Sequence, residues 1–201
     1  MTTEPRWDNR PAVERAVAEL IRALGLDPKA EPELEATPAR VADTYAEIFS
    51  GLRPTHALDL VTFPRPRGIG GGADLVVVRD LPFYSLCIHH FVPFFGHGTI
   101  AYLPDERLIG VSAAARLLDH YARRPQLQER IGAQVADHLE RLARPRGVAV
   151  ILEARHLCME MRGIRTSGWV ETRTLRGALV EPQWAAALPA AGGHASQVAH
   201  P

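Results

Sequence analysis

The sequence predicts a mixed α+β fold, in which a pair of N-terminal helices precedes a strand–strand–helix–helix–strand–strand unit with an antiparallel sheet and both helices on one face. Three observations predict it. Before residue 52, apolar residues recur at spacings of three and four, which is typical of amphipathic helices. β-Branched runs then appear in two pairs, as pleated strands favour. Between these pairs the apolar spacing returns to a helical period.

Two helices are expected in the N-terminal region. The apolar stripe of the first consists of Val13, Val17, Leu20, Ile21 and Leu24. Gly25 and Pro28 follow as stop signals. The second helix is expected to begin at Thr37, with Thr37 as its cap and Pro38 in its first turn. Its stripe consists of Val41, Tyr45, Ile48 and Phe49, and Gly51 ends it.

Four strands are expected after a connecting loop that contains Pro64, Pro66 and the glycines of 68–72. The β-branched and apolar runs place these strands at 75–78, 99–103, 148–152 and 169–175. We expect the strand at 99–103 to pair through turns with the segment around Leu108. A four-stranded sheet covered on one face leaves two open edges, which favour pairing with neighbouring subunits in a ring-shaped oligomer.

Two helices separate the strand pairs. The first is expected to be capped by Ser112, to carry Leu117, Leu118 and Tyr121, and to end before Pro125. The second has an apolar stripe at nearly regular steps of four and three: Leu127, Ile131, Val135, Leu139 and Leu142. Pro145 and Gly147 mark its end.

The predicted organisation has four regions. A flexible N-terminus covers 1–10, the helical region 11–55, the main domain 56–180, and a tail rich in Ala, Gly and Pro, expected to be disordered, 181–201. Lys+Arg and Asp+Glu both number 23, so the net charge of +0 argues against a dedicated binder of nucleic acid or anionic membranes. The sequence shows neither a signal peptide nor a membrane-spanning run of about 20 apolar residues, so we expect a cytoplasmic protein with reduced cysteines.

A candidate metal site joins two distant segments. Cys87 and His90 have the C-x-x-H spacing, which lets one backbone turn present sulfur and imidazole to the same point. His156 and Cys158 lie two residues apart at an expected strand end, where both side chains would share a face. Two thiolates and one imidazole are one ligand short of a tetrahedron, which is the catalytic zinc arrangement with a position left for water. The spare histidines suit proton transfer near neutral pH.

Three other interpretations of these residues remain open. The cysteines and histidines could belong to a core without a metal. Cys87 and Cys158 could form a disulfide, which a reducing compartment disfavours. A cysteine could also act as a nucleophile with a histidine as its base.

A second candidate site lies at the start of the long helix. Glu129 there could simply complement the helix dipole. Alternatively, its carboxylate could accept from the ring N–H and the exocyclic amine of a guanine edge, with Gln128 assisting. Arg116, Arg162 and Arg165 could grip phosphates, although a single arginine is more often solvated or ion-paired.

Four stretches together resemble the GTP cyclohydrolase I family of zinc enzymes, in matching order and at matching separations. These stretches are TPARVADTYAEIFSGL (37–52), LPFYSLCIHHFVPFFGHGTIAYLP (81–104), IGVSAAARLLDHYARRPQLQERI (109–131) and PRGVAVILEARHLCMEMRGIR (145–165). The resemblance runs from about residue 37 to residue 177. It implies a tunnelling fold, in which ββααββ subunits form a toroidal homodecamer with active sites between subunits, and it makes 56–180 the catalytic domain.

The resemblance also implies roles for individual residues. Cys87, His90 and Cys158 would hold Zn²⁺. His89 and His156 would be the acid–base histidines. Gln128 and Glu129 would anchor guanine, and three residues would contact the triphosphate, namely Ser112, Arg116 and Arg162.

The reaction implied by the resemblance is the hydrolysis of GTP to 7,8-dihydroneopterin triphosphate and formate, which opens a folate, other pterin or deazapurine route. Activated water would attack C8 of the purine while His156 protonates N7, and a second hydrolysis would release C8 as formate. His89 would assist at the ribose and phosphate end.

Two positions depart from the family pattern. Ile88 replaces a glutamate that is not a ligand, so we expect zinc binding to survive. Ala113 replaces a lysine that faces phosphate, which should cost about 1.5–3 kcal/mol for a charge-assisted hydrogen bond. Two alternatives to the main hypothesis therefore stay open. One is a purine-nucleotide cyclohydrolase with altered phosphate preference, and the other is a non-catalytic homologue that acts as an assembly or regulatory subunit.

Overall fold

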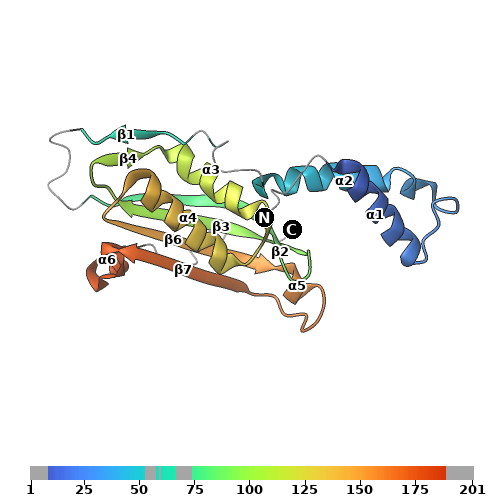
Figure 1. The fold of residues 1–201 in the computed structure, drawn as a ribbon. Helices are drawn as coiled ribbons and strands as arrows, with labels where there is room; N and C mark the ends of the chain where they lie inside the picture. The colour runs from blue at the N-terminus through green and yellow to red at the C-terminus, as the bar shows by residue number, and fades with distance from the viewer. Residues whose placement is uncertain (1–8, 53–57, 59, 67–73, 189–201) are drawn as a thin grey trace, which may run out of the picture. The chain divides into compact units, whose positions relative to one another are not determined.

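The structure is a computed structural model that describes residues 9–52, 58, 60–66 and 74–188 (Figure 1). It divides into two compact units, residues 1–57 and 58–201. The first is helical, and the second holds a sheet with two helices on one of its faces. The mixed α+β class and its ββααββ order are confirmed. The glycines at 68–72 lie outside the described residues.

The first unit consists mainly of α1 (Arg10–Ala23) and α2 (Thr37–Ile48), with short 3-10 turns at η1 (Pro32–Leu34) and η2 (Ser50–Leu52). Both predicted helices are confirmed, and Gly25 follows the first with a φ of +79°, which glycine adopts without strain. The prediction that Thr37 caps α2 is wrong. Ala36 occupies the cap position, and the Thr37 hydroxyl instead donates to the carbonyl oxygen of Glu33 at 3.4 Å.

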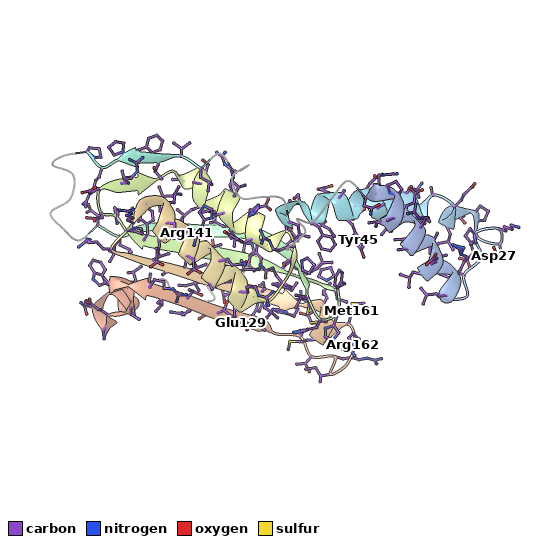
Figure 2. All side chains as sticks on the ribbon, in the orientation of Figure 1. Asp27, Tyr45, Glu129, Arg141, Met161 and Arg162 are labelled. Carbon is purple, nitrogen blue, oxygen red and sulfur yellow. The ribbon has the colours of Figure 1, made fainter. Side chains whose placement is uncertain are left out.

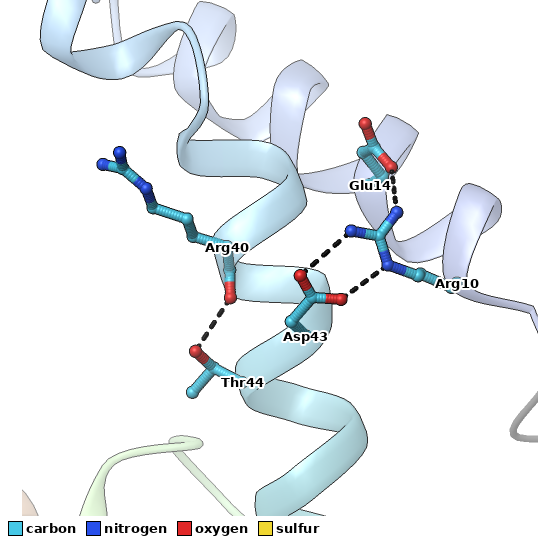
Figure 3. Close-up of polar contacts among 5 residues, drawn as sticks. All are labelled: Arg10, Glu14, Arg40, Asp43 and Thr44. Atoms are coloured by element: carbon cyan, nitrogen blue, oxygen red, sulfur yellow. Dashed lines mark hydrogen bonds and ion pairs between the residues drawn. The ribbon is translucent and has the colours of Figure 1, made fainter.

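One ion pair joins the two long helices of this unit (Figure 3). Arg10 donates from Nε and Nη2 to the two carboxylate oxygens of Asp43, at 2.6 and 3.0 Å, and from Nη1 to Glu14 at 3.0 Å. The pairing raises the pKa of Arg10 and lowers that of Asp43. Because both partners face solvent, the pair contributes little to stability.

The second unit is built on a five-stranded sheet of order β5-β2-β3-β6-β7. Its four long strands are antiparallel: β2 (Val76–Cys87), β3 (Pro93–Leu103), β6 (Gly147–His156) and β7 (Trp169–Gly177). The short β5 (Pro125–Gln126) adds to β2 in parallel. All four predicted strands are present, but three of them extend well beyond their β-branched runs, because ladder pairing also holds proline, glycine and polar residues in line.

Helices α3 (Val111–Ala122) and α4 (Gln128–Ala143) cover one face of the sheet (Figure 1). Between them and the strands lies the main core, whose fully buried large side chains include Phe83, Phe94, Leu117, Leu118, Ile131, Leu139 and Leu152. The prediction that Ser112 caps α3 is wrong. Gly110 takes that position, and Ser112 lies within the first turn.

The segment around Leu108 does not join the main sheet. It forms β4 (Arg107–Ile109), which pairs antiparallel with β1 (Thr62–Pro64) in a separate two-stranded sheet. The expected pairing with 99–103 is therefore wrong. A side-chain contact takes its place, because the Tyr102 hydroxyl accepts from the Ile109 amide at 2.9 Å and donates to the Ile109 carbonyl at 3.3 Å.

The segment after β7 packs on the other face of the sheet. It contains η4 (Ala178–Val180) and α6 (Pro182–Ala187), and Leu179 and Leu188 are buried against Ala149 and Ile151. As far as Leu188 this differs from the expected disordered tail, because two leucines within an alanine-rich run suffice to anchor it. Among the described residues, no helix combines the length and apolar character that crossing a membrane requires.

Candidate functional site

A tight turn at the end of β2 presents the first two candidate ligands. Cys87 is the last residue of the strand, and its carbonyl oxygen accepts from the amides of His90 and Phe91 at 3.2 and 2.8 Å. The carbonyl oxygen of Gln126 on β5 accepts from the Ile88 amide at 3.0 Å. The turn is therefore held by hydrogen bonds within itself and from β5, and it carries both Cys87 and His90.

Cys158 reaches the same place from a different element than expected. Strand β6 ends at His156, and Leu157–Glu160 form the one-turn helix α5, so His156 and Cys158 do not share a strand face. The expectation that these two side chains share a strand face is therefore wrong, but the expected approach of Cys158 to Cys87 and His90 is confirmed. Ligand atoms of Cys87, His90 and Cys158 all lie within 4.8 Å of one another, and Sγ of Cys87 is 3.6 Å from Nδ1 of His90.

This donor set fits a metal ion. Two sulfurs and one imidazole nitrogen are the soft and borderline ligands that Zn²⁺ takes, and three protein ligands leave a coordination position free. Both cysteines are free thiols. The pKa of Cys158 is raised, first by burial and then by the adjacent Cys87, and the guanidinium of Arg162 partly opposes this. Bound cation would replace the two thiol protons.

His156 is held on two sides, next to this cluster. Its ring stacks on Phe94 of β3, with centroids 4.7 Å apart and planes 4° from parallel. Its Nε2 lies 2.8 Å from Oε1 of Gln128. Burial lowers the pKa of His156, and the carboxylates of Glu129 and Glu160 partly oppose this. The second histidine, His89, is exposed, with Nδ1 at 3.8 Å from Sγ of Cys87.

Gln128 and Glu129 open α4 as predicted, but their side chains differ in environment. Gln128 is only 2% exposed, and its Nε2 donates to the carbonyl oxygens of Leu152 and Val170, each at 2.9 Å. Glu129 is exposed, toward the end of the unit where Arg162 also lies (Figure 2). The structure thus places Gln128 against the sheet and leaves the carboxylate of Glu129 accessible to a ligand.

The three candidate phosphate residues lie on two elements. On α3, Ser112 and Arg116 are exposed, and Nη2 of Arg116 donates to Oγ of Ser112 at 3.0 Å. Ala113 between them is 1% exposed and belongs to the core. Arg162 lies in the exposed loop after α5, with Nη1 at 3.4 Å from Nε2 of His90.

Three contributors to the site escaped the sequence analysis. Phe94 supports His156, the backbone of Gln126 supports the cysteine turn, and Arg155 fastens α5 to the end of β6. Nε of Arg155 donates to Oε1 of Glu160 at 3.0 Å, and the pair lowers the pKa of Glu160. No local pattern marks these residues, because strand register and turn geometry decide their partners.

The family model and the curated relatives agree with one another. The family model described as GTP cyclohydrolase I matches residues 13–187. "GTP cyclohydrolase 1" of Thermobifida fusca is 46% identical over 182 residues, which cover 88% of this chain and 84% of that protein. "GTP cyclohydrolase 1" of Corynebacterium glutamicum is 49% identical over 177 residues, which cover 82% and 87%. Among solved structures, the apo crystal structure of the archaeosine synthase QueF-Like matches 52% of this chain with 18% identity and a TM-score of 0.40.

Proposed function

The chain belongs to the GTP cyclohydrolase I family, and from this membership we propose that it is a zinc-dependent hydrolase that opens the guanine imidazole ring of GTP. The products would be 7,8-dihydroneopterin triphosphate and formate. One observation carries the proposal: Cys87, His90 and Cys158 gather their ligand atoms within 4.8 Å of one another. Cys158 of this cluster is two residues from His156, and His156 contacts Gln128 at the start of α4, beside Glu129.

Cys87, His90 and Cys158 would hold the metal. A zinc ion with three protein ligands lowers the pKa of water towards neutrality and so supplies hydroxide at physiological pH. Cys87 is buried and held by the turn of β2, and Cys158 is held by α5. The chain thus contributes a fixed donor set from two elements, as a catalytic site that must keep its geometry during turnover requires.

Glu129 would recognise the base. Its carboxylate is exposed at the first turn of α4 and can accept from N1–H and the 2-amino group of guanine together. Adenine offers no such pair of adjacent donors.

Ser112, Arg116 and Arg162 would bind the triphosphate. All three are exposed, and the two guanidinium groups provide forked donors for phosphate oxygens. We propose a toroidal homodecamer with active sites between subunits, so these residues need not serve the metal cluster of their own chain. Exposed apolar side chains near the outer strand β7 support association, for example Trp169 at 57% and Ile164 at 70% exposure.

The two acid–base histidines would divide the proton transfers. Water adds to C8, His156 gives a proton to N7, and the imidazole ring opens. A second hydrolysis releases C8 as formate, after which the ribose carbons rearrange and close the new ring with loss of water. The exposed His89 would act at the ribose and phosphate end.

Ala113 favours one alternative, a cyclohydrolase that prefers shorter nucleotides. Its side chain is buried in the core, so α3 offers phosphate only Ser112 and Arg116. One missing ammonium corresponds to roughly ten- to hundredfold weaker triphosphate binding. A non-catalytic assembly or regulatory subunit is the other alternative, although such a subunit would not need His89, His156 and Glu129 together.

The test is incubation of zinc-loaded protein with GTP, with formate release and the ultraviolet absorption of the pterin followed together. We expect about one zinc per chain, bound at the cluster of Cys87, His90 and Cys158, and equal amounts of both products. Zinc-loaded protein that leaves GTP unchanged would contradict the proposal. Faster turnover of GDP or GMP would favour the altered-phosphate alternative, and co-purification with an active cyclohydrolase without turnover would favour the regulatory one.

We further propose that the enzyme acts in the cytoplasm, at the start of a folate or related pterin route. Its two free thiols must stay reduced to serve as metal ligands, which a reducing compartment ensures.

A further inference from the structure

We propose that Gln128 is a positioning residue that acts through His156, and not through the guanine contact that the family resemblance implies. It holds the imidazole with a proton on Nε2, which leaves Nδ1 as the atom that exchanges a proton with the purine. The reaction concerned is the one proposed above, so the catalytic part of the inference rests on that function. The contact between the two side chains does not depend on it.

The orientation of the Gln128 amide is decided by its surroundings. Three acceptors surround Nε2: the carbonyl oxygens of Leu152 and Val170, each at 2.9 Å, and Oγ1 of Thr172 at 3.2 Å. In the flipped orientation Oε1 would face two carbonyl oxygens, which repel it. The amide nitrogen therefore points into the sheet, and Oε1 points to His156.

This orientation fixes the tautomer of His156. An amide oxygen only accepts, so Nε2 of His156, at 2.8 Å, must donate and carry the proton. In the neutral ring the lone pair is then on Nδ1. Stacking on Phe94, with planes 4° apart, fixes the plane of the ring, and the bond to Gln128 fixes its rotation within that plane.

Gln128 itself has little freedom to turn towards a base. It is 2% exposed, and both ends of its amide are engaged by the sheet and by His156. Its neighbour Glu129 is exposed and can contact guanine alone. Two adjacent residues thus take separate tasks, one at the substrate and one behind the histidine.

The proton transfer follows from this arrangement. With both ring nitrogens protonated, His156 gives the Nδ1 proton to N7: the Nδ1–H bond breaks, its electron pair stays on Nδ1, and the N7–H bond forms. The Nε2–H bond to Gln128 persists before and after the transfer, because the amide oxygen accepts from either form. The imidazole is therefore not free to rotate between the two states, which keeps the donor atom aimed.

A kinetic test compares Gln128→Met with Gln134→Met. Methionine is near in volume and cannot accept strongly, and Gln134 is an amide on the same helix that bonds to Gln126 instead of a histidine. We expect Gln128→Met to lower kcat for GTP about 10- to 100-fold, part of the range for a general acid, with KM changed less than about threefold. Gln134→Met should leave kcat close to that of the parent enzyme.

In a His156→Ala background, the same Gln128→Met substitution should cost nothing further, because the residue it acts through is gone. A raised KM with unchanged kcat, or an equal loss in both backgrounds, would overturn the inference in favour of direct guanine binding.

A spectroscopic test needs no variant and no turnover. Nitrogen-15 NMR of histidine-labelled, zinc-loaded protein, with His156 assigned by difference from His156→Ala, should show a protonated Nε2 and an unprotonated Nδ1. A proton on Nδ1 would overturn the inference. If the tautomer is as stated but the enzyme leaves GTP unchanged, the proposed function fails while the coupling between Gln128 and His156 stands.

Discussion

Gly132 of α4 lies so close to Thr174 of β7 that a Cβ on Gly132 would stand 2.6 Å from the threonine Oγ1. This close approach is one helical turn from Gln128, which reaches Val170 and Thr172 on the same strand. The missing side chain therefore helps to set the distance between helix and sheet on which the amide contacts depend.

We predict that Gly132→Ala destabilises the protein although alanine is the better helix former. The helix gains about 1 kcal/mol from propensity, but the new methyl group forces Thr174 or the helix to shift, at about 1–3 kcal/mol for overpacking. Urea unfolding should therefore show a net loss. Adding Thr174→Ala removes the clashing atom and should restore the midpoint, so a double variant as unstable as the single one would contradict this explanation.

Cys158→Ser should remove the metal. The serine oxygen is a poorer zinc ligand than a thiolate, and only two strong donors remain. We expect zinc affinity to fall by more than the roughly 10–100-fold that loss of a ligand's hydrogen-bonding partner costs. Zinc content after dialysis against a weak chelator measures this. His97→Ala, on the exposed side of β3, is the control and should keep the parent content. Equal retention by Cys158→Ser would place the metal elsewhere.

Stability should fall as the pH is lowered through the acid range, because of His120. Burial, with the charges of Arg124 and His138, lowers the pKa of His120 from 6.5 to about 4. The unfolded chain takes up this proton below about pH 6.5, and the folded chain does so only near the lowered value. The contribution of the neutral ring, on the order of 1–3 kcal/mol, is thus complete above pH 6.5 and lost as the pH falls towards 4.

Urea unfolding between pH 4 and 7 measures this loss. In a His120→Gln variant, glutamine can still accept from Arg124, as Nε2 of His120 does at 2.8 Å, but it does not titrate. We expect its free energy of unfolding to depend less on pH in this window, with a residual slope from His138 and His156, whose pKa values burial also lowers. Parallel pH profiles for the two proteins would show that His120 is not responsible.

Arg116→Ala should weaken triphosphate binding more than it slows the chemistry. The guanidinium is exposed on α3 and already bonded to Ser112, a geometry that offers phosphate a forked donor and a hydroxyl together. Loss of one charge-assisted contact corresponds to a KM for GTP raised about 10- to 100-fold. Arg123→Ala, an arginine after the same helix that pairs with Asp119, is the matched control. Equal effects of the two substitutions would argue against a specific phosphate contact.

The sequence alone determined which elements form and which residue types can carry the chemistry. Apolar periodicity predicted α1, α2, α3 and α4, because burial of one helix face leaves a local pattern at 3.6 residues per turn. The sequence also identified the two thiols and the histidine whose ligand atoms gather. The C-x-x-H spacing places Cys87 and His90 within a single turn. Caps were predicted less well: Thr37 and Ser112 suit the role, but the cap positions lie one residue earlier, at Ala36, and two residues earlier, at Gly110.

Tertiary structure alone decided how these elements and side chains meet. Strand partners depend on register between distant segments, so neither the pairing of β4 with β1 nor the stacking of Phe94 on His156 has a local signal. The turn of α5, and not a strand, brings Cys158 to Cys87 and His90. The orientation of Gln128 likewise follows from carbonyl oxygens of β6 and β7, more than twenty residues away in the chain, because a buried amide takes the direction that satisfies its hydrogen bonds.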